Sequence, residues 1–384
     1  MRRIALVTVG RSDWGLYRPI ARQIRDDPAL ELVIVAGGMH LDPAFGSTVE
    51  VIEADGFTVN ERVELLDDLD TPTGVATSMG RGTIGFAQAF ERLHPDLVLV
   101  LGDRFEMHAA AVAAMPSLVP VAHIHGGELT EGAIDDALRH SITKLSHLHF
   151  VATETYRRRV EQLGEEPWRV TVSGAPGLDN LREVELSERS ELEERLGLPL
   201  DRPTLLVTHH PVTLEPEHAE ADLDALFGAI ADAGMQVVFT APNADVGGRA
   251  ALDRMQRFAD GRDGAVFAAN LGSADYFGLM RGAVAMVGNS SSGIIEAASL
   301  SLPVVNIGSR QEGRLRPRNV IDVGSSREEI LTGIRQATEP AFRSGLEGLT
   351  NPYGDGHAAE RIVARLRDVE LGPALLRKRF HDLP

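Results

Sequence analysis

Residues 97–104 read Leu-Val-Leu-Val-Leu-Gly-Asp-Arg, an apolar run that ends in a glycine, an acid and a base. Five consecutive apolar residues are typical of a strand that is buried on both faces of a parallel sheet. Asp103 and Arg104 would then leave the carboxyl end of that strand, where parallel α/β sheets bind their ligands. An aspartate that only caps the next helix is the alternative explanation.

Similar short apolar runs recur along the whole chain and alternate with longer helical patterns. This order predicts α/β architecture with parallel sheets covered by helices. The predicted strands are 4–9, 31–36, 97–101, 121–124 and 150–152 in the first half, and 204–208, 237–241, 265–268, 285–287 and 304–307 in the second.

Two segments mark the domain organisation. The acidic stretch 183–200 has leucines at helical spacing and ends in Gly-Leu-Pro, which predicts a connecting helix and loop between two α/β halves. A charged amphipathic pattern at about 356–376 predicts a final helix that fits either half. We therefore divide the chain into 1–182, 183–355 and 356–384, and we expect the carboxyl ends of both sheets to meet at a shared cleft.

Composition excludes several classes of protein. The chain has 384 residues, of which 43% are hydrophobic, so we expect two or three compact, soluble domains. A net charge of −18 disfavours nucleic acid and anionic membranes as partners. The chain has no cysteine, and its only lysines are Lys144 and Lys378, which excludes thiolate chemistry and a Walker lysine loop. No apolar run is long enough to span a membrane, so the expected location is the cytoplasm.

Acids and histidines cluster after the strand predicted at 121–124. In His-Ile-His-Gly-Gly-Glu (123–128), strand alternation would point both histidines to one side, while the glycines let a ligand approach the backbone. Positions 136, 139, 140, 143 and 147 then share one polar helical stripe. We favour a catalytic cleft; a solvated helix face and a zinc site are alternatives, although the spacing matches no common zinc motif.

The second half carries the pattern of an anion site. Gly-Asn-Ser-Ser-Ser-Gly (288–293) follows a strand and precedes a helical pattern at 294–300, so its N–H groups would suit a diphosphate, unless Ser290 is only a helix cap. Glu296 would reach a ribose, and the guanidinium of Arg310 could bind phosphate through two N–H groups. Polar residues also end two further strands, at His209-His210-Pro211 and Pro242-Asn243-Ala244-Asp245.

In this order, the motifs resemble those of the hydrolysing UDP-N-acetylglucosamine 2-epimerases of sialic-acid biosynthesis. The non-hydrolysing bacterial epimerases have a similar fold, but they carry Pro-Glu in place of Ser12-Asp13 and a different histidine motif. Some hydrolysing relatives have Glu in place of His125. The resemblance covers nearly the whole chain and rests on GRSD (10–13), GDRFE (102–106), HIHGGE (123–128), RHSITKLSHLHF (139–150), GNSSSG (288–293), GSRQEGR (308–314) and NPYGDG (351–356).

The resemblance implies a GT-B fold, in which two Rossmann-like domains are followed by a C-terminal helix that crosses back to the first. It also implies a homodimer or homotetramer, no redox cofactor and no obligatory metal. For the sugar it implies a first-domain site made of Arg11, Asp13, His40, Asp103, Arg104, Glu128, Asp135, His147 and His149. For UDP it implies a second-domain site made of His210, Asn243, Asp245, Ser290, Ser291, Glu296 and Arg310.

The implied reaction is anti elimination of UDP from UDP-N-acetylglucosamine to give 2-acetamidoglucal, followed by addition of water to release N-acetylmannosamine. Because the C2 proton is barely acidic, departure of the diphosphate must lead, and Arg310, His210 and the Ser290–Ser291 amides would stabilise that anion. The catalytic base stays open among Asp103, Glu128, Asp135 and His125.

Three other functions fit the same motifs. The first is the same chemistry on a UDP-2,4-diacetamido-2,4,6-trideoxy sugar or a GDP-sugar, as in legionaminic-acid synthesis. The second is a GT-B glycosyltransferase, which would need an acceptor sugar. The third is a nucleotide-sugar-binding protein without turnover, which would have no use for the acid and histidine cluster at 103–149.

Overall fold

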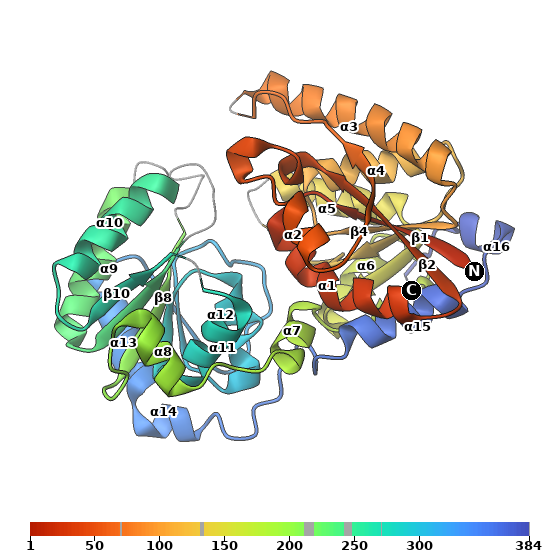
Figure 1. Ribbon diagram of the computed structural model, residues 1–384. Helices are drawn as coiled ribbons and strands as arrows, with labels where there is room; N and C mark the ends of the chain where they lie inside the picture. Colours follow the sequence, from red (N-terminus) through yellow and green to blue (C-terminus); the bar gives the residue numbers. More distant parts are fainter. Residues whose placement is uncertain (70, 131–133, 211–218, 242–247, 270, 384) are drawn as a thin grey trace. The chain divides into compact units, whose positions relative to one another are not determined.

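A computed structural model of the chain describes residues 1–69, 71–130, 134–210, 219–241, 248–269 and 271–383. The chain forms two compact units, each built on one sheet with helices packed on its faces (Figure 1). The first unit comprises Met1–Leu129, Ala133–Asp179 and Tyr353–Pro384, and the second is built mainly from Asn180–Pro352. The described strand pairings in both sheets are parallel, which confirms the predicted α/β class.

The sheet of the first unit has seven strands in the order β3-β2-β1-β4-β5-β6-β7. Its strands are β1 (Arg2–Thr8), β2 (Leu30–Gly37), β3 (Val59–Val63), β4 (Leu97–Leu101), β5 (Val121–Ile124), β6 (Leu148–Val151) and β7 (Val170–Val172). Its helices are α1 (Arg11–Asp26), α2 (Val49–Ala54), α3 (Pro72–Leu93), α4 (Phe105–Ala114), α5 (Ile134–Leu145), α6 (Glu154–Gln162), α15 (Ala358–Asp368) and α16 (Pro373–Leu376), with α7 (Gly177–Glu183) at the junction of the two units. The strand order reverses between β1 and β4, so the ligand-binding edge is expected where these two strands end.

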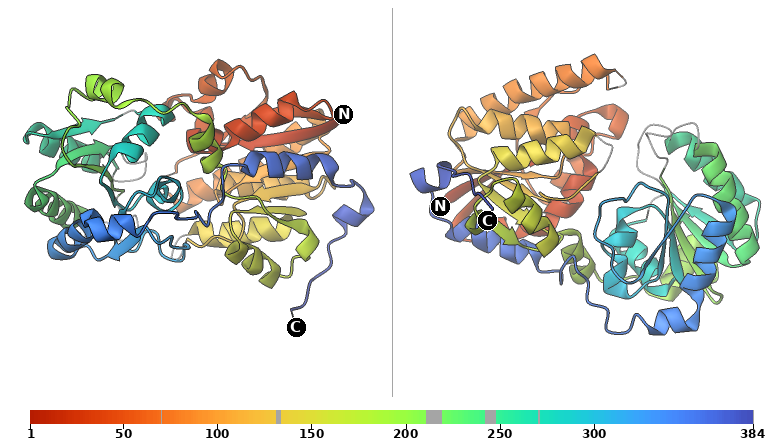
Figure 2. Two further views of the ribbon diagram at one scale, coloured as in Figure 1. Left: turned by 90° about the horizontal axis from the view of Figure 1, so that it is seen from below. Right: turned by 180° about the vertical axis from the view of Figure 1, so that it is seen from behind.

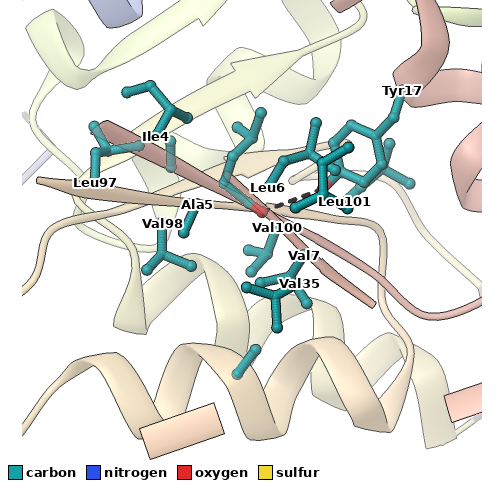
Figure 3. Packing of buried hydrophobic residues seen from close by; sticks show 14 of the residues in the cluster. Ile4, Ala5, Leu6, Val7, Tyr17, Val35, Leu97, Val98, Val100 and Leu101 are labelled. Atoms are coloured by element: carbon teal, nitrogen blue, oxygen red, sulfur yellow. Dashed lines mark hydrogen bonds between the residues drawn. The ribbon is translucent and has the colours of Figure 1, made fainter. Parts of the chain in front are cut away.

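The core of this unit explains why β1 and β4 are continuous apolar runs. Ile4, Leu6, Val98 and Val100 are fully buried, because helices cover both faces of the central strands (Figure 3). This burial holds the segments that follow β1 and β4 at fixed positions.

The sheet of the second unit has six strands in the order β10-β9-β8-β11-β12-β13, with the reversal between β8 and β11. Its strands are β8 (Thr204–Thr208), β9 (Gln236–Thr240), β10 (Ala265–Ala268), β11 (Ala285–Gly288), β12 (Val304–Ile307) and β13 (Val320–Val323). Its helices are α8 (Arg189–Leu196), α9 (Ala219–Ala233), α10 (Gly248–Asp260), α11 (Ser273–Gly282), α12 (Ser291–Ile294), α13 (Arg327–Thr338) and α14 (Pro340–Ser344).

The C-terminal helix α15 belongs to the first unit, as the resemblance implied. It packs against α1 (Figure 2). Ile362 and Leu366 are buried in the core of that unit. The carboxylate of Asp179 accepts hydrogen bonds from the backbone amides of Ala358 and Ala359, at 3.0 and 2.8 Å, and so binds the start of the helix. Among the described helices of both units, none combines the length and the apolar character that a membrane span requires.

Candidate active site

Asp13, Arg104 and Glu106 meet at the point where the strand order of the first unit reverses. Arg104 donates two hydrogen bonds to the fully buried Glu106, from Nη2 at 2.7 Å and from Nε at 3.2 Å. Burial raises the pKa of Asp13 to about 6, although the charge of Arg104 acts in the opposite direction. The site therefore holds a carboxyl group whose protonation changes near neutral pH.

Asp103 is held by α5 and does not cap α4. The N-cap residue of α4 is Arg104, and its side chain makes no capping bond. The Asp103 carboxylate instead accepts a hydrogen bond from Arg139, whose guanidinium also lies 3.8 Å from Glu128. Arg139 lies on the predicted polar stripe, but the sequence gives it no role, because only the fold shows which acids it reaches.

Glu128 and His125 form the next contact. The two side chains are joined by a 2.6 Å hydrogen bond between His125 Nδ1 and Glu128 Oε1. Glu128 is only 3% exposed, and its carboxylate is stabilised by the hydrogen bond with this imidazole and by the nearby guanidinium of Arg139. Glu128 is thus an acid with a defined orientation.

Asp135 lies in the first turn of α5, next to this network. Burial raises its pKa, and the neighbouring charge of Asp103 adds to the effect, while Arg104 and Arg139 oppose it. Two nearby carboxyl groups with different environments suit acid–base chemistry.

His40 and Arg11 complete the predicted residues at this edge. His40 is fully buried, and its ring nitrogens lie 2.9 Å from Thr8 Oγ1 and 2.8 Å from Thr48 Oγ1. Burial lowers its pKa to about 4, so it is neutral at pH 7. Arg11, the first residue of α1, is exposed.

The predicted alternation of His123 and His125 does not hold. Strand β5 ends at Ile124, and His125 adopts a left-handed conformation with φ of 67°, so the two side chains have different surroundings. His123 is buried, and its Nε2 donates to the carbonyl of Gly102 at 2.7 Å. Burial lowers the pKa of His123 to about 3, so the ring supports the turn before Asp103 as a neutral group.

His147 and His149 do not join Asp103 and Glu128. His147 lies beyond the end of α5, and its Nδ1 accepts a hydrogen bond from the amide of Val121, the first residue of β5. It therefore lies at the amino-terminal ends of the strands, opposite the carboxyl ends where Asp103 and Glu128 lie. The polar stripe predicted on one helix therefore stops before it. His149 Nε2 bonds Glu165 at 2.9 Å inside the unit. His149 therefore belongs to a second polar network centred on Glu165.

In the second unit, the residues after β8, β11 and β12 come together. The φ of Gly288 is +138°, and a Cβ atom there would lie 2.0 Å from the carbonyl oxygen of Thr208, so only glycine fits. Arg310 Nη1 donates to the carbonyl oxygen of Asn289 at 3.0 Å. Burial lowers the pKa of His210 to about 3, and Arg310 adds to this effect. A neutral imidazole and a guanidinium thus stand at the predicted diphosphate site.

The serine loop differs from the predicted helix N-terminus. Ser290 is an N-cap whose Oγ accepts from the Ser292 amide at 3.4 Å, but α12 ends after Ile294 and a 3-10 turn follows at Ala297–Leu300. One α-helical turn has only a small dipole, so an anion would depend on local N–H groups around Ser290 and Ser291. Tyr276 belongs to none of the sequence motifs, yet it hydrogen-bonds Ser290 and Ser292. Burial raises the pKa of Tyr276, and the nearby charge of Glu296 adds to this effect.

Asn243 and Asp245, which we predicted at the UDP site, lie outside the described residues. Metal binding was the other alternative for the acid and histidine clusters. Within the described ranges, no group of three or more His, Asp or Glu side chains is placed to hold a metal ion.

Two doubly wound units with polar residues at the strand ends define an α/β enzyme of the GT-B fold. The chain belongs to the UDP-N-acetylglucosamine 2-epimerase family, because a model of the family with that description matches residues 22–367. It is 38% identical to the UDP-N,N'-diacetylbacillosamine 2-epimerase (hydrolyzing) of Legionella pneumophila over 98% of this chain and 99% of the relative. It is 37% identical to the GDP/UDP-N,N'-diacetylbacillosamine 2-epimerase (hydrolyzing) of Campylobacter jejuni, over 100% of this chain and 99% of that relative.

A solved structure shows the same fold. The UDP-GlcNAc 2-epimerase of Neisseria meningitidis bound to UDP-GlcNAc superposes with a TM-score of 0.81 at 19% identity, covering 95% of this chain and 99% of that one.

Proposed function

We propose that this enzyme is a hydrolysing nucleotide-sugar 2-epimerase, with the sugar site in the first unit and the UDP site in the second. The observation that carries the proposal is the linked set of acids at the end of β4 and β5, in which Arg139 contacts both Asp103 and Glu128. A protein that only binds a nucleotide sugar has no use for such a set. The family membership of the chain supports the same conclusion.

The proposed reaction begins with cleavage of the bond between C1 and the diphosphate oxygen, and UDP leaves with the bonding electrons. A carboxylate of the first unit takes the C2 proton, which gives a 2-acetamidoglucal. Water then adds a hydroxyl group at C1, and a proton returns to C2 from the opposite face. Arg310 and His210 would stabilise the leaving diphosphate.

The proton-transfer role is best assigned to the pair Asp103 and Asp135. Burial and the charge of Asp103 raise the pKa of Asp135, which favours Asp135 as the acid that delivers a solvent-derived proton to C2, with Asp103 as the base that removes the original proton from the other face. Glu128 is held by His125 and Arg139 and is suited to stabilise positive charge on the ring. Arg11, Asp13, His40 and Arg104 would bind the sugar, and Ser290, Ser291, Glu296, Asn243 and Asp245 would bind UDP.

The substrate is best identified from the relatives. Both relatives described above are named for N,N'-diacetylbacillosamine nucleotides. We therefore propose UDP-N,N'-diacetylbacillosamine as the first substrate to test and UDP-N-acetylglucosamine as the second. The homodimer or homotetramer and the cytoplasmic location stay predictions.

The test is incubation of the pure protein with each nucleotide sugar in heavy water, without acceptor or reductant, followed by NMR of the sugar. We expect UDP and a free 2-epimeric sugar with deuterium at C2. Release of an unepimerised sugar with protium at C2 would show simple hydrolysis. Turnover that requires an acceptor would show a glycosyltransferase, and binding without turnover would show a sensor.

A further inference from the structure

Asn289 extends the pairing of β8 and β11 beyond the end of both strands. The regular register ends at the pair Thr208 and Gly288. One residue later, the Asn289 side chain bonds both main-chain groups of His210: its Oδ1 accepts from the amide at 2.7 Å, and its Nδ2 donates to the carbonyl at 2.8 Å. Asn289 is fully buried.

The main chain of Asn289 is also bound from two sides. Its carbonyl oxygen accepts from Arg310 Nη1 at 3.0 Å and from Gln311 Nε2 at 2.8 Å. Its amide lies 3.2 Å from the carbonyl oxygen of Thr208, to which it donates. One residue thus joins the segments that follow β8, β11 and β12, where the strand order of the second unit reverses.

We propose that Asn289 is a positioning residue that holds His210 and Arg310 in register for the diphosphate of the ligand. The inference rests on the proposed UDP site. A side-chain amide suits this position because it donates to and accepts from the same backbone residue, which a carboxylate or an apolar side chain of similar size does not do. Because both hydrogen bonds between Asn289 and His210 are buried, loss of the side-chain amide removes two buried bonds from the His210 main chain and the His210 segment moves.

A matched control exists in the same unit. Asn319 is also fully buried, and its Nδ2 donates to the carbonyl of Leu302 at 2.7 Å, but neither residue belongs to the proposed UDP site. Asn319→Ala therefore removes a buried amide hydrogen bond without touching His210 or Arg310.

The experiment compares UDP affinity, measured by calorimetry, with uridine affinity, measured by ligand-observed NMR, in the full chain. For Asn289→Ala we expect the Kd for UDP to rise at least tenfold while the Kd for uridine stays within threefold, since only UDP carries the diphosphate. For Asn319→Ala we expect both constants to stay within threefold even where Tm falls. An unchanged UDP affinity in Asn289→Ala, or equal losses for UDP and uridine, would overturn the proposal.

A second variant decides the question if Asn289→Ala does not fold. Gln311→Met removes the Gln311 donor from the Asn289 carbonyl at similar side-chain size, and Gln311 Oε1 has no partner in the described structure to lose. We expect its UDP affinity to fall at least threefold with uridine affinity retained, and an unchanged UDP affinity would overturn the inference. If the wild-type protein does not bind UDP, the proposed function fails, which is a separate result.

Discussion

Asp103 is a candidate for the proton-transfer step, and one substitution tests this role. We expect Asp103→Asn to lower turnover by about a hundredfold or more, because an amide cannot accept a proton. Affinity for UDP should stay within about tenfold, roughly 1.4 kcal/mol, since Asp103 is assigned to the sugar and not to the nucleotide. Steady-state kinetics and calorimetry with UDP give the two values.

The control for Asp103→Asn is a thermal melt of the same variant. Its neutral amide weakens the contact with Arg139, so some loss of stability is expected together with the loss of turnover. A variant with lower Tm but full turnover would remove Asp103 from the reaction and leave it only a structural role.

The buried carboxyl group of Asp13 predicts how the stability of the protein depends on pH. Its pKa rises from 3.8 to about 6 on folding because the carboxyl group is buried. The folded state therefore holds the proton more tightly than the unfolded chain, and this contribution to stability is lost as pH rises from about 4 to about 6. Asp13→Asn has no such loss. The free energy of unfolding of this variant, relative to that of wild type, should therefore rise by on the order of 2–3 kcal/mol between pH 4 and pH 7.5.

Urea unfolding at the two pH values checks this prediction. Asp201→Asn is the matched control for the removal of one carboxylate, because Asp201 is exposed. A difference between Asp13→Asn and wild type that is the same at both pH values would contradict the burial argument.

At the scale of elements, Gly288 ends β11 in a place that only glycine can occupy. Gly288→Ala would put a Cβ atom 2.0 Å from the carbonyl oxygen of Thr208, so we expect a loss of about 3 kcal/mol or more. Gly282→Ala is the control, because nothing lies within 4 Å of a Cβ atom at this position, the last residue of α11. Alanine there should raise the free energy of unfolding by up to about 1 kcal/mol. Thermal melts compare the two, and equal Tm values would contradict the close approach of β11 to β8.

Strands were predictable from sequence where both of their faces are buried and, in the partly exposed edge strand β10, where all four residues are apolar. Each of the predicted runs overlaps a strand, and the bounds agree within two residues. The strands that were missed, β3, β7 and β13, all lie at sheet edges and are partly exposed. An edge strand such as Val-Asn-Glu-Arg-Val at Val59–Val63 needs no continuous apolar run, so its sequence does not differ from that of a loop.

At the scale of the whole molecule, the C-terminal segment completes the first unit. Glu165 is fully buried, and it binds Lys378 Nζ at 2.8 Å and Lys144 Nζ at 2.6 Å, so both lysines of the chain meet one carboxylate. Burial acts to raise the pKa of Glu165, but its hydrogen bonds with His149 and the lysines lower it to about 2. Lys378 also donates to two backbone carbonyls, those of Lys144 and Ser146. The tail is therefore part of the fold of residues more than two hundred positions earlier.

Replacement of each lysine tests this arrangement. Lys378→Met should lower the stability of the first unit by about 2–4 kcal/mol, because the side chain is only 19% exposed and its loss removes one of the cations that compensate the fully buried Glu165. Lys144→Met should cost about 1 kcal/mol or less, because that side chain is 42% exposed. Both tryptophans, Trp14 and Trp168, lie in the first unit, so their fluorescence during urea unfolding reports on that unit alone. Equal losses in the two variants would contradict the role assigned to the tail.

The sequence alone determined the α/β class and the interior strands, and it placed the polar motifs directly after them. It did so because a strand buried on both faces must be apolar throughout, and because parallel sheets present their carboxyl ends to ligands. The tertiary structure alone decided which polar groups are partners. Arg139 reaches Asp103 and Glu128, and Asn289 bonds His210 across 79 positions of sequence, only because the order of strands brings these segments together. His147 matches the motif but lies at the amino-terminal ends of the strands. The position of a residue in a motif does not determine at which end of a strand it lies.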